Sequence, residues 1–401
     1  METPYIYTTI RTPRGRGHAE KGGLRNVRPI DLLKVLFNHL TQVEKLDNSL
    51  VEDISLGCNT VYGEQGANLA KIATLYSGWS DKINGVTLSS FCTSGLEAIQ
   101  NAAMKVMTGA AQLTIAGGVE SMSRVPMFSD KGEWFSNVEV IKKSGFVHMG
   151  IAADIVAKLN GISSDELNEY TLRSHQLAAK AWTKKSYTNN VIPVLINYSE
   201  EFARDELIRE NLKLEKLHQL PKVVNVQKEG RSVKFVQNTI KELGSFEALH
   251  NVGNAPGIAD AASLVLIGNE VVGKQINMEP IAKIIGFASA SAHPTIMLTG
   301  VVNATRKVLA KANLTIDDID LFEVNESFAS VPLMYQKELN IPLSKLNVNG
   351  GAIAMGHPIG ATGGILLGSL ITALKERRLK RGLVTICGGA GIAQATLVEL
   401  V

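Results

Sequence analysis

The apolar positions of this chain recur with two periods, one typical of strands and one typical of helices. Short apolar runs such as Gly85-Val-Thr-Leu and Leu383-Val-Thr-Ile end in Gly- or Ser-containing turns, which is typical of buried strands. The stretches from Ser94 to Met104 and from Ile365 to Leu374 carry apolar residues at helical spacing. Alternation of buried strands with helices predicts an α/β fold in which helices cover mixed sheets.

The two ends of the chain resemble each other. Asp53-Ile-Ser-Leu is matched by Asp318-Ile-Asp-Leu, and Thr114-Ile-Ala-Gly-Gly is matched by Thr385-Ile-Cys-Gly-Gly. Chance explains either pair alone, and the spacings between them differ. The pattern therefore predicts a degenerate duplication rather than a regular repeat array.

The segment between the two ends is more polar and holds most of the charge runs. We therefore predict an inserted domain at residues 120–250. The first half then comprises residues 1–119 and 251–275, and the second half comprises residues 276–401. The basic run that starts at Lys375 is expected to place cations at the negative end of the second helix.

Composition excludes several classes of protein. The 401 residues are 45% hydrophobic and 20% charged, which is ordinary for a globular chain and argues against disorder. With 41 Lys and Arg against 38 Asp and Glu, the formal charge of +3 does not indicate a nucleic-acid partner. No stretch holds the 18 or so apolar residues that span a bilayer, so no membrane association is expected.

Three cysteines cannot form a disulfide framework for a chain of this length, and none stands in a C-x-x-C metal motif. Reduced thiols are expected, and with them a cytoplasmic location. The histidines at positions 18, 39, 175, 218, 250 and 293 show no metal-ligand spacing, so no metal site is expected.

Cys92 is the first candidate for chemistry, because it stands in Ser89-Ser-Phe-Cys-Thr-Ser-Gly, where a strand passes into a helix. Unpaired N–H groups at a helix start favour the thiolate, so we expect a lowered pKa and a usable nucleophile. A buried, inert cysteine is the alternative interpretation. Cys58 has no helix start beside it and is expected to be only structural.

His357 is the second candidate, in the loop Asn349-Gly-Gly-Ala-Ile-Ala-Met-Gly-His-Pro-Ile-Gly-Ala-Thr-Gly-Gly. A loop this rich in glycine lets the backbone approach a ligand closely. It is not a Walker loop, and the glycines from Gly389 onward do not complete a dinucleotide fingerprint. A surface histidine is the alternative, but Gly356 and Pro358 on either side suit an oriented imidazole.

Cys387 ends another predicted strand, and Asn325 in Val324-Asn-Glu-Ser-Phe-Ala follows a third. If the two halves pack about a pseudo-two-fold axis, the loops that hold Cys92, His357 and Cys387 meet at one site. The alternative for Asn325 is an N-cap or Asx turn for the helix that follows.

At this point the sequence resembles the thiolase family over nearly its whole length. The motifs that carry the resemblance are Cys92-Thr-Ser-Gly, Gly117-Gly-Val-Glu-Ser-Met-Ser, Asn325-Glu-Ser-Phe-Ala, Gly356-His-Pro-Ile-Gly-Ala-Thr-Gly and Cys387-Gly-Gly. Arg11-Thr-Pro-Arg-Gly is similar to the fatty-acid-degrading branch, and His148-Met-Gly and Asp205-Glu-Leu-Ile-Arg are similar to segments of its inserted loop domain. The resemblance implies two pseudo-symmetric βαβαβαββ halves in an α-β-α-β-α arrangement.

The resemblance also implies roles for these residues. Cys92 is acylated by a 3-ketoacyl-CoA or acetyl-CoA, His357 activates its thiol, and coenzyme A enters as the second substrate. Cys387 exchanges a proton with the α-carbon of the acetyl unit. Asn325 holds a water in one oxyanion hole, and the N–H groups of Cys92 and Gly389 form the other.

Several other positions enter through the resemblance. Met149, Pro256 and Gly257 are expected to contact coenzyme A or the acyl group. Met149 and Trp134 are candidates for lining the acyl pocket, and packing in the core or at an interface is the alternative for both. Pro256 replaces a serine that would bind the pantetheine arm, which puts the affinity for coenzyme A in doubt. Ala261 stands where glycine is usual, and Ser327 replaces the usual alanine without an expected penalty.

The function expected is thiolytic cleavage of 3-ketoacyl-CoA or the reverse condensation, as in β-oxidation. The alternatives are a short-chain acetyl-CoA acetyltransferase and a non-catalytic protein that binds acyl-CoA or lipid. A decarboxylating ketoacyl synthase is disfavoured, because that chemistry usually needs two histidines and no second cysteine. No permanently bound cofactor is expected, and the resemblance implies a homodimer or homotetramer.

Overall fold

The computed structural model describes residues 1–196 and 200–401. Ten strands join in one mixed sheet, six from the first half and four from the second. Those of the first half are β1 (Tyr5–Arg11), β2 (Gly15–Arg16), β3 (Asp53–Gly57), β4 (Asn84–Leu88), β5 (Leu113–Ser121) and β8 (Ala259–Gly268). Those of the second half are β9 (Ala282–Ser291), β10 (Leu321–Val324), β11 (Arg381–Cys387) and β12 (Ile392–Leu400).

The strand order is β10-β11-β12-β9-β1-β8-β5-β3-β4, and β2 pairs with β8. From either end the pattern is similar: parallel strands come first, then antiparallel ones toward the centre. The halves meet where β1 and β9 pair at only two residue positions. The predicted duplication is therefore visible in the topology of the sheet.

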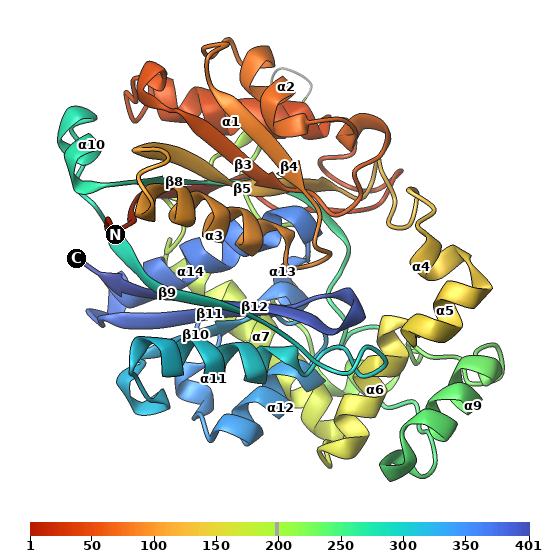
Figure 1. Ribbon diagram of the computed structural model, residues 1–401. Coiled ribbons are helices and arrows are strands. Elements are labelled where there is room, and N and C mark those ends of the chain that lie inside the picture. Colours follow the sequence, from red (N-terminus) through yellow and green to blue (C-terminus); the bar gives the residue numbers. More distant parts are fainter. Residues whose placement is uncertain (197–199) are drawn as a thin grey trace.

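Helices form three layers around the two halves of the sheet (Figure 1). α1 (Pro29–Gln42) and α2 (Leu69–Tyr76) cover the outer face of the first half, and α11 (Gly300–Ala312) and α12 (Ser330–Leu339) cover that of the second. α3 (Ser94–Met107) and α14 (Thr362–Arg377) lie between the halves. The predicted α-β-α-β-α arrangement is confirmed.

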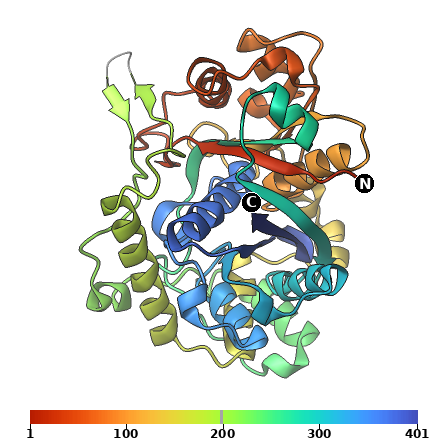
Figure 2. The same ribbon diagram turned by 90° about the vertical axis from the view of Figure 1, so that its left-hand side faces the viewer.

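The described part of residues 120–250 holds further α-helices and strands, most of them beside the layers (Figure 1). They are α4 (Glu133–Ser136), α5 (Val138–Ser144), α6 (Met149–Leu159), α7 (Ser164–Thr183), β6 (Val194–Ile196), β7 (Glu200–Phe202), α8 (Leu214–His218) and α9 (Gly230–Thr239). In Figure 2 the β6–β7 pair projects from the edge of the molecule. Ile151, Leu167 and Tyr170 share one apolar cluster with Phe322 and Val331 of the second half, so the insertion has no separate core there.

The two central helices touch through glycine at their N-terminal ends. A Cβ atom at Gly363 would lie 2.1 Å from the backbone nitrogen of Leu96, and one at Gly95 would lie 2.4 Å from the carbonyl oxygen of Gly360. Neither position has room for a side chain. This close approach brings together the two loops that precede the helices, which hold Cys92 and His357.

One detail of the predicted duplication is wrong. Asp53 opens β3, but Asp318 ends a short 3₁₀ turn before β10, so the two segments do not occupy equivalent positions. The basic run places Lys375 and Arg377 in the last turn of α14, at the negative end of the helix as predicted. The run continues beyond the helix to Arg381, which opens β11 and pairs with Glu399.

Two short helical elements hold the loop of His357, and one further helix connects the two halves. α13 (Ala352–Met355) and the 3₁₀ turn Ile359–Ala361 lie on either side of His357, and α10 (Glu270–Gln275) joins the halves. Ala261 lies in β8 without a positive φ, so alanine is accommodated where the resemblance expects glycine. Within the described ranges, no helix has the length and apolar character needed to cross a bilayer.

Candidate active site

Cys92 lies in a tight turn between β4 and α3. Phe91 before it has φ of 53°, in the left-handed region, which is unfavourable for a bulky side chain and typical of functional turns. The Ser94 hydroxyl accepts a hydrogen bond from the N–H of Ser90 at 2.9 Å and donates one to the carbonyl of Phe91 at 2.6 Å. The turn therefore holds the sulfur at the start of α3, as the sequence predicts.

One cavity of about 220 Å³ is lined by Cys92, His357 and Cys387 together. The three residues come from separate loops of both halves, as the pseudo-two-fold hypothesis requires. Other expected site residues that line it are Met149, Pro256, Gly257 and Gly389. The remaining walls are mostly apolar and include Met122, Met127, Val223, Ile258, Met297, Leu298, Phe328 and Ile359. Asn325 is fully buried and does not line the cavity.

The protonation of His357 follows from its neighbours. The Thr362 hydroxyl donates to the carbonyl of Pro358 at 2.9 Å, so it can only accept from the His357 ring, whose Nδ1 lies 2.8 Å away. Nδ1 thus carries the proton and Nε2 is the basic nitrogen. Nε2 is buried and has no hydrogen-bond partner among the residues that the structure describes. Burial, and then the charge of Arg14, lower the pKa of His357 to about 4, which keeps the ring neutral at physiological pH.

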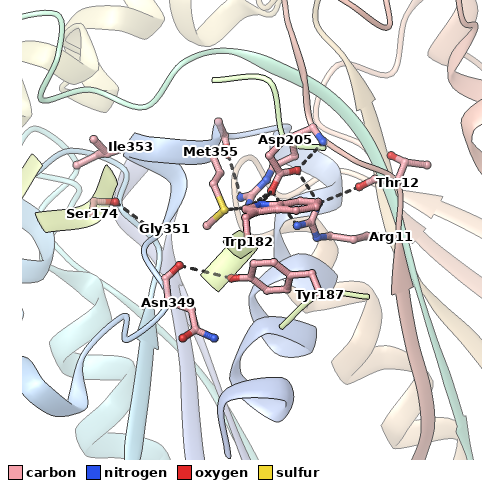
Figure 3. Close-up of polar contacts among 12 residues, drawn as sticks. Arg11, Thr12, Ser174, Trp182, Tyr187, Asp205, Asn349, Gly351, Ile353 and Met355 are labelled. Carbon is pink, nitrogen blue, oxygen red and sulfur yellow. Dashed lines mark hydrogen bonds and ion pairs between the residues drawn. The ribbon is translucent and has the colours of Figure 1, made fainter. Parts of the chain in front are cut away.

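A buried ion-pair cluster supports the loop of His357 (Figure 3). Asp205, from the inserted segment, accepts two hydrogen bonds from the Arg11 guanidinium at 2.7 and 2.8 Å. It also accepts from the backbone N–H of Arg14 at 2.8 Å and from its guanidinium at 3.1 Å. Arg14 in turn donates to the carbonyl of Gly356, next to His357, at 3.3 Å. The inserted segment and the N-terminal strand therefore both help to place the imidazole.

Glu120 ties the loop of His357 to the first half of the chain. Its buried carboxylate accepts N–H groups from Asn59, Thr60 and Gly360 at 2.8 to 3.1 Å, and from the side chain of Gln65 at 2.8 Å. Gly360 belongs to the same loop as His357. Glu120 is part of the motif Gly117-Gly-Val-Glu, so the sequence contained the signal, but the cross-half contact was not predicted.

Cys387 ends β11 and is buried. The hydroxyl of Ser327 lies 3.3 Å from its sulfur and accepts a hydrogen bond from the Asn325 amide at 2.8 Å. The amide group of Asn325 therefore points to Ser327, and its Oδ1 is buried without a hydrogen-bond partner in residues 1–196 and 200–401. The contact of Ser327 with Cys387 was not predicted from the sequence, which treated this serine as a neutral change.

Both thiols are protonated at rest. Burial, followed by the neighbouring Cys387 and Glu120, raises the pKa of Cys92 to about 12. Burial raises the pKa of Cys387 to about 11, and Ser327 opposes this effect. The expectation that the helix start lowers the pKa of Cys92 is therefore wrong, because desolvation in the apolar cavity outweighs the favourable N–H groups. Cys92 needs a base, and the free Nε2 of His357 is suited to be one.

A second cavity of about 90 Å³ also reaches Cys92. Trp134, Phe135 and Met149 of the inserted segment line it with Phe91 and Gly389. The Trp134 ring packs against Phe91 at a tilt of 47° with centroids 4.8 Å apart, and a Cβ atom at Gly389 would lie 2.7 Å from that indole. Met149 lines both cavities, and Trp134 lines this one.

Cys58 is buried away from the cavity lining, with its sulfur 3.9 Å from the Glu120 carboxylate, consistent with a structural residue. Over the described ranges, no group of three or more His, Cys, Asp or Glu residues is arranged to hold a metal ion.

Comparison with known proteins decides the family. The model of the thiolase N-terminal domain matches residues 5–271, and that of the thiolase C-terminal domain matches residues 278–400. The chain belongs to the thiolase family. It is 34% identical to the 3-ketoacyl-CoA thiolase of Bacillus subtilis (strain 168), over all of both chains. It is also 34% identical to a probable acetyl-CoA acyltransferase of Staphylococcus aureus (strain COL), over 100% of this chain and 99% of that one.

The fold of the family is shared as well. The crystal structure of the Bacillus anthracis acetyl-CoA acetyltransferase superposes with a TM-score of 0.86 at 30% sequence identity, and the match covers 100% of this chain and 99% of that one. The resemblance to thiolases stated from the motifs alone is confirmed.

Proposed function

We propose that this member of the thiolase family is a 3-ketoacyl-CoA thiolase, an acyltransferase that cleaves its substrate with coenzyme A or runs the reverse condensation. The observation that carries the proposal is the single cavity in which two neutral thiols and one imidazole with a free Nε2 meet. The names of two relatives, 3-ketoacyl-CoA thiolase and probable acetyl-CoA acyltransferase, support the same chemistry.

In the first half-reaction Cys92 attacks the 3-keto carbonyl while Nε2 of His357 takes the thiol proton. The bond between C2 and C3 then breaks, and its electron pair goes to C2. Cys387 gives its thiol proton to that carbon, which releases acetyl-CoA and leaves an acyl group on Cys92. The N–H groups of Cys92 and Gly389 are proposed to stabilise the oxyanion at the attacked carbon.

Between the half-reactions the proton on His357 passes through water to the Cys387 thiolate, which returns both groups to their neutral forms. In the second half-reaction the thiol of coenzyme A attacks the acyl group on Cys92, and its proton passes to the imidazole of His357 and on to the departing Cys92 sulfur. In the synthetic direction the same steps run in reverse, so that Cys387 removes the α-proton of acetyl-CoA.

Substrate contacts are proposed from the lining of the two cavities. Met149, Pro256 and Gly257 line the larger cavity, where the pantetheine arm has to pass. The apolar walls of the smaller cavity suit the acyl chain. A short-chain acetyl-CoA acetyltransferase is the second candidate, favoured by the small volume beside Cys92 and by the name of the similar solved structure. A series of 3-ketoacyl-CoA substrates of increasing chain length separates the two.

Two tests address the chemistry itself. Cys92→Ser is expected to abolish acyl transfer, so that mass spectrometry finds no acyl group on that peptide after incubation with acetyl-CoA. Cys387→Ala is expected to retain acylation of Cys92 and to lose condensation. A wild-type protein that never acylates Cys92 would favour the non-catalytic alternative, in which acyl-CoA is only bound.

A homo-oligomer and a reducing, cytoplasmic compartment are also part of the proposal. β4 is an edge strand of the sheet, and Val86 on it is exposed, as are Ile72 and Met104 on the neighbouring helices α2 and α3. An apolar sheet edge of this kind suits pairing with a second copy. All three cysteines are free. Light scattering during gel filtration measures the oligomeric state.

A further inference from the structure

Ser327 is the only hydroxyl group among the residues that line the larger cavity in the described structure. It lies in the loop between β10 and α12, at the position where the thiolase motif commonly has alanine. Its oxygen lies 3.3 Å from the sulfur of Cys387 and 2.8 Å from the amide nitrogen of Asn325. No step of the proposed mechanism uses this serine.

The direction of these hydrogen bonds follows from the donors available. The Asn325 amide donates to the Ser327 oxygen, so the single hydroxyl proton of Ser327 is free to point at Cys387. A thiolate can only accept such a bond, and accepts it more strongly than a thiol does. The bond therefore favours the charged form of Cys387 over the neutral one.

We propose that Ser327 is a positioning residue that orients Cys387 toward the cavity and stabilises its thiolate, with Asn325 fixing the direction of the hydroxyl group. The inference rests on the proposed function of Cys387 as the acid and base. It gives the amide of Asn325 a different task from the oxyanion-hole water that the resemblance implies, because that amide points to Ser327.

Among the residues that the structure describes, no other side chain is placed to do the same. The titratable side chains that share the cavity with Cys387 are Cys92, His357 and His148, and none of the described Asp, Glu, Lys or Arg residues lines it. Burial is the main influence on the pKa of Cys387, and the Ser327 side chain acts on that pKa in the opposite direction, together with the backbone N–H of Cys387 itself. Losing the hydroxyl group thus removes the one side-chain contact that favours the thiolate.

The test measures Cys387 directly in a Cys92→Ala background, which removes the other thiol of the cavity. The rate of iodoacetamide alkylation of the Cys387 peptide is followed by mass spectrometry from about pH 7 to pH 10, a range below its pKa of about 11, in which the rate follows the fraction of thiolate. Ser327→Ala is expected to lower this rate about tenfold at each pH of the range, which corresponds to a rise of about one unit in the pKa of Cys387. Ser327→Thr keeps the hydroxyl group and is expected to restore the rate.

Ser330→Ala is the matched control. Ser330 is a buried serine three residues further on, whose hydroxyl donates to the carbonyl of Ala153 and does not line the cavity. Its removal is expected to leave the alkylation profile of Cys387 unchanged. Equal profiles for Ser327→Ala and its parent would overturn the inference.

A second readout uses the native Cys92. Acetyl exchange between acetyl-CoA and coenzyme A needs only Cys92 and His357, whereas condensation also needs Cys387. Ser327→Ala is expected to lower the ratio of condensation to exchange about tenfold, and an equal fall of both rates contradicts a role through Cys387. If Cys387→Ala still condensed acetyl-CoA, the proposed function would fail, whatever the result for Ser327.

Discussion

The ion-pair cluster behind His357 offers the sharpest test of how this fold holds its site. Asp205 is fully buried and accepts hydrogen bonds from both nitrogens at the end of Arg11, from the N–H and guanidinium of Arg14, and from the Trp182 indole at 3.3 Å. Asp205→Asn keeps the size of the side chain but removes its charge and turns one acceptor into a donor. Two buried guanidinium groups then face a donor without a compensating charge.

The expected loss is large because the charges are desolvated. Removing one partner of a buried, hydrogen-bonded ion pair costs about 3–5 kcal/mol. Arg11 and Arg14 hold the pKa of Asp205 far below its ordinary value. A carboxyl with a depressed pKa contributes stability above its unfolded pKa of about 3.9 and loses it as the pH falls through the folded pKa. The full difference between the two proteins is therefore expected at pH 7.

Urea unfolding followed by tryptophan fluorescence measures the difference. Glu210→Gln is the control, because the Arg204–Glu210 pair is about half exposed and such pairs contribute about 0–1 kcal/mol. Since Arg14 also holds the carbonyl of Gly356, Asp205→Asn is expected to slow acylation of Cys92 in the fraction that stays folded. A loss of stability as small as that of the Glu210→Gln control would refute the argument.

Three further predictions follow from the cavity. His357, with a pKa lowered to about 4, is neutral above that pH, so acylation of Cys92 is expected to stay constant from about pH 5.5 to pH 8; a titration near 6.5 would contradict this. Iodoacetamide alkylation of Cys92 without substrate is expected to keep rising through pH 9, because burial raises its pKa to about 12; a plateau by pH 7 would show a resting thiolate. Trp134→Ala opens the smaller cavity and is therefore expected to raise kcat/KM for longer 3-ketoacyl-CoA substrates by about tenfold relative to acetoacetyl-CoA. An unchanged ratio would show that the acyl chain of the substrate does not bind in this cavity.

Local pattern was sufficient to predict the elements that position the site. Helical spacing from Ser94 predicted α3, and the apolar run before the glycines at Gly388 predicted β11, because each is an uninterrupted periodic segment with clear ends. The meeting of the loops that hold Cys92, His357 and Cys387 was predicted only from the similarity of the two halves. In the structure these loops meet because α3 and α14 cross closely at Gly95 and Gly363, and no local sequence pattern specifies that crossing.

Contacts between distant segments could not be predicted in the same way. Asp205 and Arg14 are 191 positions apart, and Glu120 and Gly360 are 240 apart. Asp205, Arg14 and Glu120 are charged residues of a kind that is usually exposed, and the sequence around each gives no indication of its distant partner. The sign of the pKa change at Cys92 was wrong for a related reason: its position at a helix start is local, whereas the burial that dominates is supplied by the inserted segment and the second half.

The neutrality of the resting cavity constrains how the chemistry can proceed. At rest, Cys92 and Cys387 are protonated and His357 is not. Transfer of the Cys92 proton to His357 without substrate would create a thiolate and an imidazolium in an apolar cavity, where charges are costly. Proton transfer from Cys92 is favourable only when the negative charge can move on to the carbonyl oxygen of a bound thioester or ketone, where oriented N–H groups stabilise it. Deprotonation and attack are therefore expected to be coupled, and the substrate itself completes the activation of the nucleophile. The same condition protects both thiols from reaction when no substrate is bound.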